Sequence, residues 1–503
     1  MSLLKTNVIA NFSGRFVGAV LSLIFVPVYV GILGVESYGL IGVFVSLQAA
    51  FFLLDMGLST TLNRELARRN GVPGMAQEAR DLVRSLEYVY WLLAGVIAAT
   101  GAVLADFIAG YWVNVETLER ETVRQAVVVM GMVIASQLPL KLYQGGLAGL
   151  QKQLLVNVLE TVLLVFRLGG AALILWFVSP TIQAYFLWQL FAAVVSVIVM
   201  GCSLWRNLAP TGVRSRFQKG LLESVWRFAA GLTGISLSVF LLMQVDKILL
   251  SRMISLKEFG YYSLATSAAL TLTRFIGPIY NASFPRLTQL ANVGNEGELT
   301  ILYHKCCQLM AAVILPVGSI CIVFRSEILM AWIADADIVY NTATIFGLLV
   351  AGTTLNGLVN IPYALQLANG WTSLGFYVNL GALVIIIPMM IALVLLYGAI
   401  GGAVAWLVLN SGYILIAVRL MHRRLLKDEM WSWYICDVGK PLVVSLAAAA
   451  LLFWLMPAGL SRVMTLVYLG CSFLVASCAT GMSVSAVRIW TAKMFLGLSA
   501  HYR

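Results

Sequence analysis

Residues 33–39 read LGVESYG, and residues 254–260, which lie 221 positions further along the chain, read ISLKEFG. Two more pairs of segments repeat in the same order, at offsets of 220 and 218 residues. They are residues 143–149 and 363–369 (YQGGLAG and YALQLAN), and residues 182–188 and 400–406 (IQAYFLW and IGGAVAW). Hydrophobic segments that recur in order at a nearly constant offset predict a duplicated helical membrane unit. Because such units commonly enclose a central site, we expect the functional residues between the two copies.

The composition is typical of a protein that crosses a membrane many times. Of the 503 residues, 61% are hydrophobic and only 11% are charged, whereas about a quarter of the residues of a water-soluble domain are charged. The formal net charge of +11 is explained more simply by cationic loops that fix membrane orientation than by nucleic-acid binding. We therefore expect no nucleic-acid partner.

Cysteine and histidine indicate neither a disulfide framework nor a metal site. Seven cysteines are scattered, mostly inside apolar segments, and the adjacent pair Cys306 and Cys307 lacks CxxC spacing. The three histidines, His304, His422 and His501, lie far apart in the sequence. We therefore expect no metal and no cofactor.

Stretches of about 20 apolar residues, the length that a membrane helix needs, are separated by short polar interruptions. They predict an all-α fold with fourteen transmembrane helices. The first six are residues 7–33, 37–62, 86–108, 123–150, 154–178 and 182–204. The second six are residues 224–250, 259–287, 301–324, 341–368, 372–396 and 402–421, and a last pair, 438–456 and 463–485, falls outside the repeat.

The distribution of Lys and Arg predicts that both termini are cytoplasmic. With the N-terminus inside, the cytoplasmic side collects 22 of these cations and the other side 6, which is the bias that sets membrane orientation. Since each copy of the repeat holds an even number of helices, both copies start on the same side. Their symmetry axis should then run along the membrane normal.

The predicted helices and their orientation also predict the domain organisation. We expect an N-lobe, a cytoplasmic linker, a C-lobe, an extra helix pair and a cytoplasmic tail at residues 1–204, 205–223, 224–422, 438–485 and 486–503. The outward-facing connections are all short, so they leave no room for an extracytoplasmic domain. A membrane-embedded glycan polymerase or ligase would usually need such a domain, and we therefore expect a protein that is not an enzyme.

Eight charged residues lie well inside the predicted helices. They are the cations Arg15, Lys141, Arg167, Lys247 and Arg274, and the acids Asp55, Glu160 and Asp246. A charge at the centre of a bilayer costs at least about 3 kcal/mol, so each must face a wet cavity, pair with another charge or reach the interface. The excess of cations favours an anionic ligand, because a guanidinium can bind phosphate oxygens in a bidentate manner.

Helical spacing groups several of these residues with neutral polar side chains. Asn7, Asn11 and Arg15 form one stripe, and Arg274 shares another with Asn281. Asn356 and Asn360 line a third face. Gln48 and Ser59 accompany Asp55, and Gln137 accompanies Lys141.

Such stripes indicate a water-filled cavity, although interhelical hydrogen bonds would produce the same pattern. We therefore interpret Arg15, Arg274 and Lys141 as candidate substrate-binding residues, and the five asparagines named above as candidate cavity residues. Asp55, Glu160, Arg167, Asp246 and Lys247 are candidates for ion coupling or gating, or simply structural partners.

The sequence resembles the polysaccharide flippase branch of the multidrug/oligosaccharidyl-lipid/polysaccharide (MOP) superfamily, the Wzx-type O-antigen flippases. The resemblance is carried by residues 11–44 (NFSGRFVGAVLSLIFVPVYVGILGVESYGLIGVF), 53–68 (LLDMGLSTTLNRELAR) and 245–265 (VDKILLSRMISLKEFGYYSLA). It implies two six-helix lobes around a central cavity and transfer of a lipid-linked oligosaccharide across the bacterial inner membrane.

The resemblance also bears on the site residues. In the related MurJ-like lipid II flippases, arginines on helices 1, 2 and 8 line the cavity, and Arg15 and Arg274 match helices 1 and 8. Helix 2 departs from that pattern because it offers Asp55, which argues against lipid II as the substrate. The expected partners are a polyprenyl-pyrophosphate-linked oligosaccharide, membrane lipids, and, as candidates, a polysaccharide polymerase and a chain-length regulator.

Two further readings stay open beside the flippase. A MATE-like multidrug exporter has the same architecture, but a cationic drug would require an excess of intramembrane acids rather than of cations. A structural scaffold would have no need for charges on several membrane helices. For a flippase, rocking of the two lobes would suffice, with cations holding the pyrophosphate while the apolar tail stays in the lipid.

Overall fold

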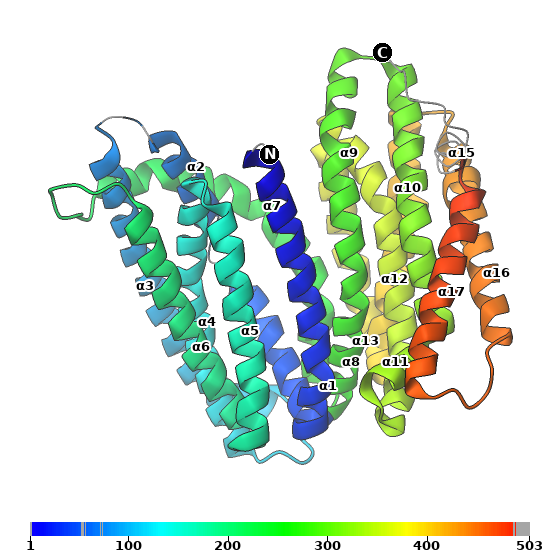
Figure 1. Ribbon diagram of the computed structural model, residues 1–503, viewed down its shortest axis with the longest axis horizontal. Helices are drawn as coiled ribbons and strands as arrows, with labels where there is room; N and C mark the ends of the chain where they lie inside the picture. Colours follow the sequence, from blue (N-terminus) through cyan, green and yellow to red (C-terminus); the bar gives the residue numbers. More distant parts are fainter. Residues whose placement is uncertain are drawn as a thin grey trace. The chain divides into compact units, whose positions relative to one another are not determined.

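The computed structural model describes residues 3–51, 55, 57–70, 72, 74–485 and 488, and within these it describes only the backbone of residues 3–17, 19 and 223–239. The chain divides into two compact units, Met1–Gly260 and Tyr261–Arg503. The described residues are mainly helical, and they contain no β-strand, only an isolated bridge between Asn114 and Ser255 (Figure 1). The predicted all-α fold is therefore confirmed.

The described residues of unit 1 form the following helices and end with the first turn of α8. They are α1 (Leu3–Phe51), α2 (Leu58–Arg69), α3 (Ala76–Phe107) with the π-helical turn η2 (Ile108–Trp112), α4 (Arg120–Gly149), α5 (Gln153–Phe177), α6 (Ile182–Asn207), α7 (Lys219–Met253) and the start of α8 (Leu256–Ala269). Helix α4 is central and packs against α2, α3 and α6. Small residues permit this packing, because a Cβ on Gly101 of α3 would lie only 2.9 Å from the Cα of Gly131 on α4.

Unit 2 is organised around α10 and α12. Its elements are the rest of α8, the 3₁₀ turn η3 (Leu270–Leu272), α9 (Thr273–Val293), α10 (Glu296–Val323), α11 (Arg325–Ile333), α12 (Ala336–Ala368), α13 (Thr372–Gly412), η4 (Tyr413–Val418), α14 (Arg419–Arg424), α15 (Met430–Ser432), η5 (Trp433–Gly439), α16 (Lys440–Trp454) and α17 (Arg462–Ser483). Helix α12 packs against α9, α10 and α13, whereas α10 also packs against α16 and α17.

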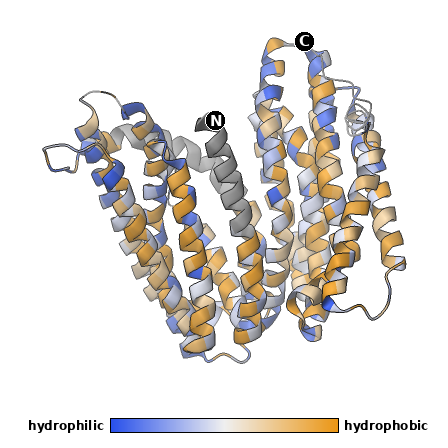
Figure 2. Ribbon diagram, viewed as in Figure 1, coloured by the Kyte–Doolittle hydropathy of each residue, from blue (hydrophilic) through white to orange (hydrophobic). Residues whose placement is uncertain are grey.

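Hydrophobic residues occupy most of the length of the described helices (Figure 2), as expected for helices that face lipid. Val103, Phe177 and Leu395 are each more than 70% exposed. Apolar side chains exposed to this extent are unfavourable in water and are expected where a helix faces lipid. Within the described residues, ten helical spans are long and apolar enough to cross a membrane. The chain is therefore a multi-pass membrane protein, and the count of fourteen helices stays a prediction.

Two glycines break helices where the sequence predicts a junction between two membrane helices. Gly34 interrupts α1 with a φ of 79°, and Gly398 interrupts α13 with a φ of 56°. Both values lie in the left-handed region that favours glycine. As a result, the span 20–51 includes parts of two predicted helices, and the span 372–424 includes the whole of two others.

Several boundaries differ from the predicted ones. The sequence predicts one helix at residues 37–62, whereas the structure gives α1 up to Phe51 and α2 from Leu58, with Asp55 in a 3₁₀ turn and Gly57 in the left-handed region at a φ of 73°. The helix predicted at residues 259–287 is divided by η3. The short helix α11 follows α10 in a stretch that hydrophobicity alone does not identify, because Arg325 and Glu327 interrupt the apolar run.

The repeated segments occupy corresponding places along the chain. The first pair lies at the Gly34 break of α1 and at the junction of α7 with α8. The second pair lies at the C-terminal ends of α4 and α12, and the third at the start of α6 and just after the Gly398 break of α13. This correspondence supports the duplication, whereas the predicted lobe boundary at residues 205–223 stays a prediction.

Candidate functional site

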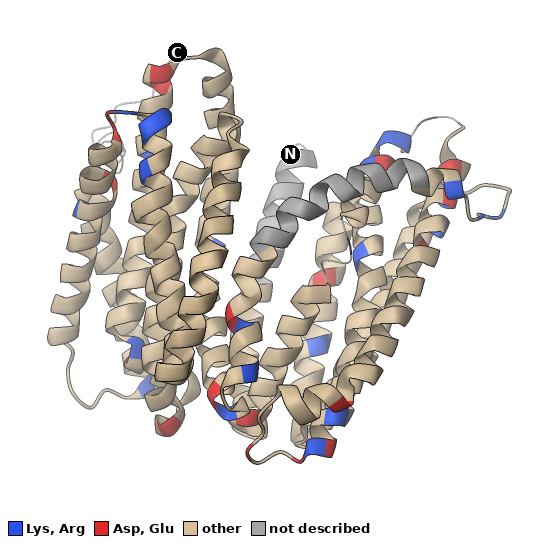
Figure 3. Ribbon diagram, turned by 180° about the vertical axis from the view of Figure 1, so that it is seen from behind, with Lys and Arg blue, Asp and Glu red and all other residues tan. Residues whose placement is uncertain are grey.

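Charged residues are sparse along the helices and gather mainly near their ends (Figure 3). A charged candidate residue far from a helix end is therefore an exception in either unit. The side chains of Asn7, Asn11 and Arg15 on α1 lie outside the described part of the structure. Their predicted roles stay predictions.

Asp55 is held by two hydroxyl groups in unit 1. Its Oδ1 accepts a hydrogen bond from the Tyr90 hydroxyl of α3 at 2.5 Å, and its Oδ2 accepts one from the Ser59 hydroxyl of α2 at 2.8 Å. Tyr90 is completely buried. The carboxylate thus joins the turn between α1 and α2 to α3, a contact that no local sequence pattern indicates.

The polar faces predicted around Asp55 and Lys141 meet through glutamines. The Gln48 amide of α1 donates to the amide oxygen of Gln137 on α4, and Gln137 is buried. Lys141, one turn further along α4, is exposed. Because exposed membrane positions face either lipid or water, a lysine there is consistent with a polar path.

The intramembrane pair on α7 is an ion pair between sequence neighbours. The Lys247 ammonium lies 3.1 Å from Oδ1 of Asp246 and also donates to the carbonyl of Met243 at 3.1 Å. Asp246 is 6% exposed. This pairing offsets part of the cost of burying both charges, as a structural or a gating pair would.

Glu160 and Arg167 on α5 have different surroundings. Glu160 is exposed, whereas Arg167 is half-buried beside α6, where the Trp188 indole donates to the Arg167 backbone carbonyl at 3.1 Å. Both residues lie on one helix, as predicted. A role of either residue in gating stays a prediction.

A buried glutamate that the sequence analysis does not single out lies inside the repeated motif itself. Glu36, 7% exposed, accepts hydrogen bonds from the backbone N–H groups of Glu116 at 2.6 Å and Thr117 at 2.9 Å. In the same region, the Asn114 carbonyl accepts from the N–H of Leu256 at 2.7 Å. Glu36 therefore holds the loop between η2 and α4.

In unit 2, the strongest candidate is Arg274 in the first turn of α9. Its side chain is exposed, and among the described residues no hydrogen bond or ion pair to it is present. Asn281, about two turns further along the same helix, is also exposed. A guanidinium facing hydrocarbon would cost roughly 3 kcal/mol, so this side chain is better suited to a polar cavity.

The asparagines of α12 form a chain of hydrogen bonds within unit 2. The Asn356 amide donates to the side-chain oxygen of Asn410 on α13 at 2.8 Å, and the Asn360 amide donates to the Asn356 carbonyl at 2.8 Å. Asn410 is completely buried. These groups satisfy one another, so their arrangement fits helix packing at least as well as substrate contact.

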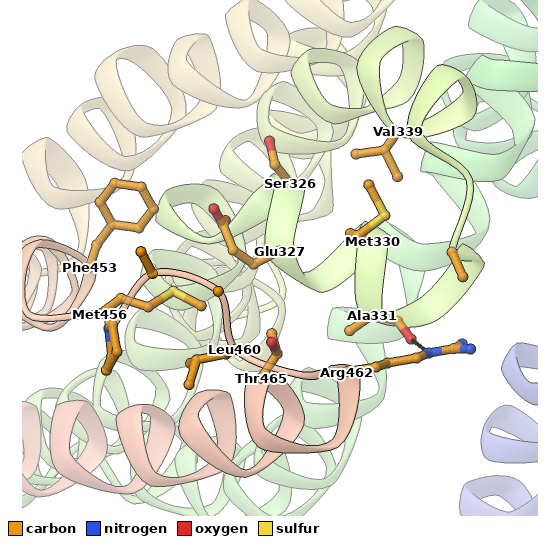
Figure 4. A pocket seen from close by; sticks show the side chains of 14 residues that line it. Ser326, Glu327, Met330, Ala331, Val339, Phe453, Met456, Leu460, Arg462 and Thr465 are labelled. Carbon is orange, nitrogen blue, oxygen red and sulfur yellow. Dashed lines mark hydrogen bonds between the residues drawn. The ribbon is translucent and has the colours of Figure 1, made fainter.

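A pocket of about 680 Å³ lies elsewhere in unit 2, between α11, the start of α12 and the loop that joins α16 to α17 (Figure 4). Its wall is mainly apolar and includes Met330, Phe453 and Met456, while Glu327 contributes a carboxylate. Arg462 at its edge donates to the carbonyls of Ala331 at 2.7 Å and Trp332 at 3.0 Å. No residue predicted for the substrate site lines this pocket.

The fold resembles those of solved transporters. A structure titled "Lipid II flippase MurJ, inward closed conformation" matches 94% of this chain and 98% of its own, with a TM-score of 0.70 and 13% identity. A MATE-family multidrug resistance transporter of the MOP superfamily, in its inward-facing conformation, matches 81% of this chain and 94% of its own, with a TM-score of 0.64 and 15% identity. The chain therefore has the fold of MOP-superfamily transporters.

Sequence comparisons identify the branch. A Shigella flexneri protein named "Putative O-antigen transporter" is 23% identical over 377 residues, which are 74% of this chain and 87% of that protein. The family model described as "Polysaccharide biosynthesis protein" matches residues 4–291. This match covers more than half of the chain and includes all of unit 1 beyond its first residues. The chain therefore belongs to the polysaccharide biosynthesis protein family.

Proposed function

We propose that this protein is a flippase that transfers a polyprenyl-pyrophosphate-linked oligosaccharide from the cytoplasmic to the outer leaflet of the bacterial inner membrane. The family match over residues 4–291 carries this proposal. The similarity to an O-antigen transporter and the fold shared with MurJ support it. The product would serve the synthesis of a cell-surface polysaccharide.

The chemistry of the cargo explains why a membrane helical protein is needed. The sugar cannot cross hydrocarbon, whereas the polyprenyl tail need not leave it. Arg15, Arg274 and Lys141 would bind the pyrophosphate, since hydrogen bonds between cations and phosphate are among the stronger polar contacts. The exposed position of Arg274 on α9 supports this assignment.

Alternating access would follow from rocking of two lobes, proposed at residues 1–204 and 224–422 and joined by a cytoplasmic linker. Both termini would be cytoplasmic, as the 22 to 6 distribution of Lys and Arg indicates. Outward movement of one uncompensated negative charge would release about 2.3 kcal/mol at an inside-negative potential of about 100 mV. The potential would thus favour export.

Lipid analysis of a host that lacks the protein tests this function. The expected result is a polyprenyl-pyrophosphate oligosaccharide that accumulates in the cytoplasmic leaflet and disappears when the wild-type protein is restored. Add-back of Arg15→Ala or Arg274→Ala should fail to clear it, while an Arg286→Ala control, at an exposed position of α9, should succeed. Absence of accumulation, together with sensitivity of the host to cationic drugs, would instead indicate a multidrug exporter.

A further inference from the structure

A cluster of ionisable side chains joins α10 to the segment that begins the C-terminal helix pair. On α10, Nδ1 of His304 contacts Oδ2 of Asp437 in η5, and Nε2 of His304 lies 3.1 Å from Oε2 of Glu429, just before α15. The Gln308 amide donates to the other oxygen of Asp437 at 2.9 Å. The Ser485 hydroxyl, beyond the end of α17, donates to the Gln308 amide oxygen at 2.9 Å. One network therefore fastens both ends of the helix pair to α10.

The geometry around His304 requires an extra proton. A neutral imidazole has one N–H donor and one lone pair, so it can donate to only one carboxylate. Here each ring nitrogen faces a carboxylate oxygen. Both contacts can be hydrogen bonds only if the ring is an imidazolium or if one carboxyl group is protonated. In either case the three groups together carry one negative charge, rather than the two of the deprotonated cluster.

Exposure falls steadily from one end of the cluster to the other. The side chain of Glu429 is 36% exposed, that of His304 15% and that of Asp437 1%. The cluster thus leads from the surface into the interior of unit 2. Chains of carboxylates and imidazoles also form the proton relays of transporters. Asp437 also lies in the π-helical segment η5, and π-helical turns are frequent at functional sites.

The remaining titratable groups do not neutralise the carboxylates. On α10, Lys305 is exposed, whereas Tyr303 and Cys307 are buried. On α14, buried His422 contacts the Tyr303 hydroxyl at 3.2 Å and the Val418 carbonyl at 2.9 Å. The hydroxyl of Tyr434 in η5 donates to the Ile414 carbonyl. Among the described residues, no Lys or Arg forms an ion pair with Asp437 or Glu429.

We propose that Glu429, His304 and Asp437 form a proton-binding site that couples transport to the proton gradient. This inference rests on the proposed function for the transport step and on the proposed topology for its cytoplasmic location. When the proton leaves for water, an N–H bond of the imidazolium breaks and its electron pair stays on the ring. The charge of the cluster then becomes −2, and one of the two contacts turns repulsive. The contact between His304 and the more exposed Glu429 breaks, and this loosens the attachment of α15 to α10.

Histidine ¹⁵N NMR of the protein labelled only at histidine tests proton binding without any substrate. With three histidines in the chain, His422→Gln and His501→Gln variants assign the signals. At about pH 8, where a free imidazole is neutral, His304 should still show the signature of a ring protonated at both nitrogens, or of a neutral ring that accepts a strong hydrogen bond from a protonated carboxyl group. Asp437→Asn and Glu429→Gln should each shift this signal, and Glu296→Gln in the first turn of α10 should not.

A His304 signal of an ordinary neutral ring at about pH 8, unchanged by Glu429→Gln, would overturn the proton site. Retention of the wild-type signal in both carboxylate variants would overturn it as well. These outcomes do not depend on whether the protein is a flippase. A failure of the proposed function therefore remains distinguishable from a failure of this site.

Coupling is measured in vesicles that contain the purified full-length protein and the lipid-linked oligosaccharide. If one proton is exchanged per cycle, a gradient of one pH unit should change the transbilayer distribution by about tenfold at equilibrium. His304→Gln should still transfer the lipid but lose the dependence on the gradient, and Glu296→Gln should behave like the wild type. If the transbilayer distribution reached with the wild-type protein did not depend on the pH gradient, the coupling role would be overturned.

Discussion

Gly39 and Gly260 occupy equivalent places in the two copies of the repeated motif, and each approaches the backbone of the other copy. A Cβ on Gly39 would lie 2.2 Å from the carbonyl oxygen of Leu256, and a Cβ on Gly260 would lie 2.2 Å from that of Val35. Both contacts lie inside unit 1. The stretch that reveals the duplication is therefore also the place where its two copies pack.

Replacement of either glycine should destabilise the protein. Gly39→Ala and Gly260→Ala introduce a methyl group that has backbone rather than a flexible side chain in its way, at an expected cost of about 1–3 kcal/mol. Gly95→Ala on α3, where no heavy atom lies within 4 Å of the added Cβ, is the matched control. Thermal unfolding in detergent measures the difference. Equal melting temperatures for all three variants would contradict the close packing.

Removal of the Tyr90 hydroxyl should expose the structural role of Asp55. Tyr90→Phe leaves a carboxylate without one of its two donors, and hydrogen bonds to charged groups contribute about 1.5–3 kcal/mol. Tyr88→Phe, at a tyrosine of α3 that is 59% exposed, should have almost no effect. Denaturant unfolding of both variants provides the comparison. If Asp55 served only in ion coupling, the stability of Tyr90→Phe would equal that of the control.

The topology can be tested with single cysteines. Glu119 precedes α4 and Arg214 lies between α6 and α7, and both are exposed. After replacement of the seven native cysteines, we expect a membrane-impermeant maleimide added to intact inner-membrane spheroplasts to label Glu119→Cys. Arg214→Cys should react only after the membrane is opened. The reverse pattern would place the termini outside.

The sequence predicts the helices well where hydrophobicity changes abruptly. The predicted helix at residues 154–178 corresponds to α5 (Gln153–Phe177), and the one at 182–204 to α6 (Ile182–Asn207). The turn that contains Asp55 is missed because the apolar run continues across it. The left-handed Gly34 and Gly398 lie at predicted junctions, but the sequence alone does not reveal that the helices on either side abut there.

Contacts between distant helices are what the sequence cannot supply. The pairing of Asp55 with Tyr90 and that of His304 with Asp437, separated by 133 residues, have no periodic signature. The wide spacing of the three histidines in the sequence indicates only that they do not form a metal site, and it gives no sign that His304 lies beside Asp437. Burial distinguishes Asp437, whose side chain is 1% exposed, because a carboxylate buried to this extent needs partners.

The transfer of a lipid-linked oligosaccharide between leaflets tests the central claim most directly. Vesicles with the lipid initially in the inner leaflet are treated with a membrane-impermeant reagent that modifies only externally exposed sugar. The wild-type protein and Arg286→Ala should make most of the oligosaccharide accessible. Arg274→Ala should slow the transfer by about tenfold or more, since loss of a charge-assisted contact costs roughly 1.5–3 kcal/mol. If the wild-type protein left the lipid in the inner leaflet, or if Arg274→Ala matched the control, the account would be contradicted.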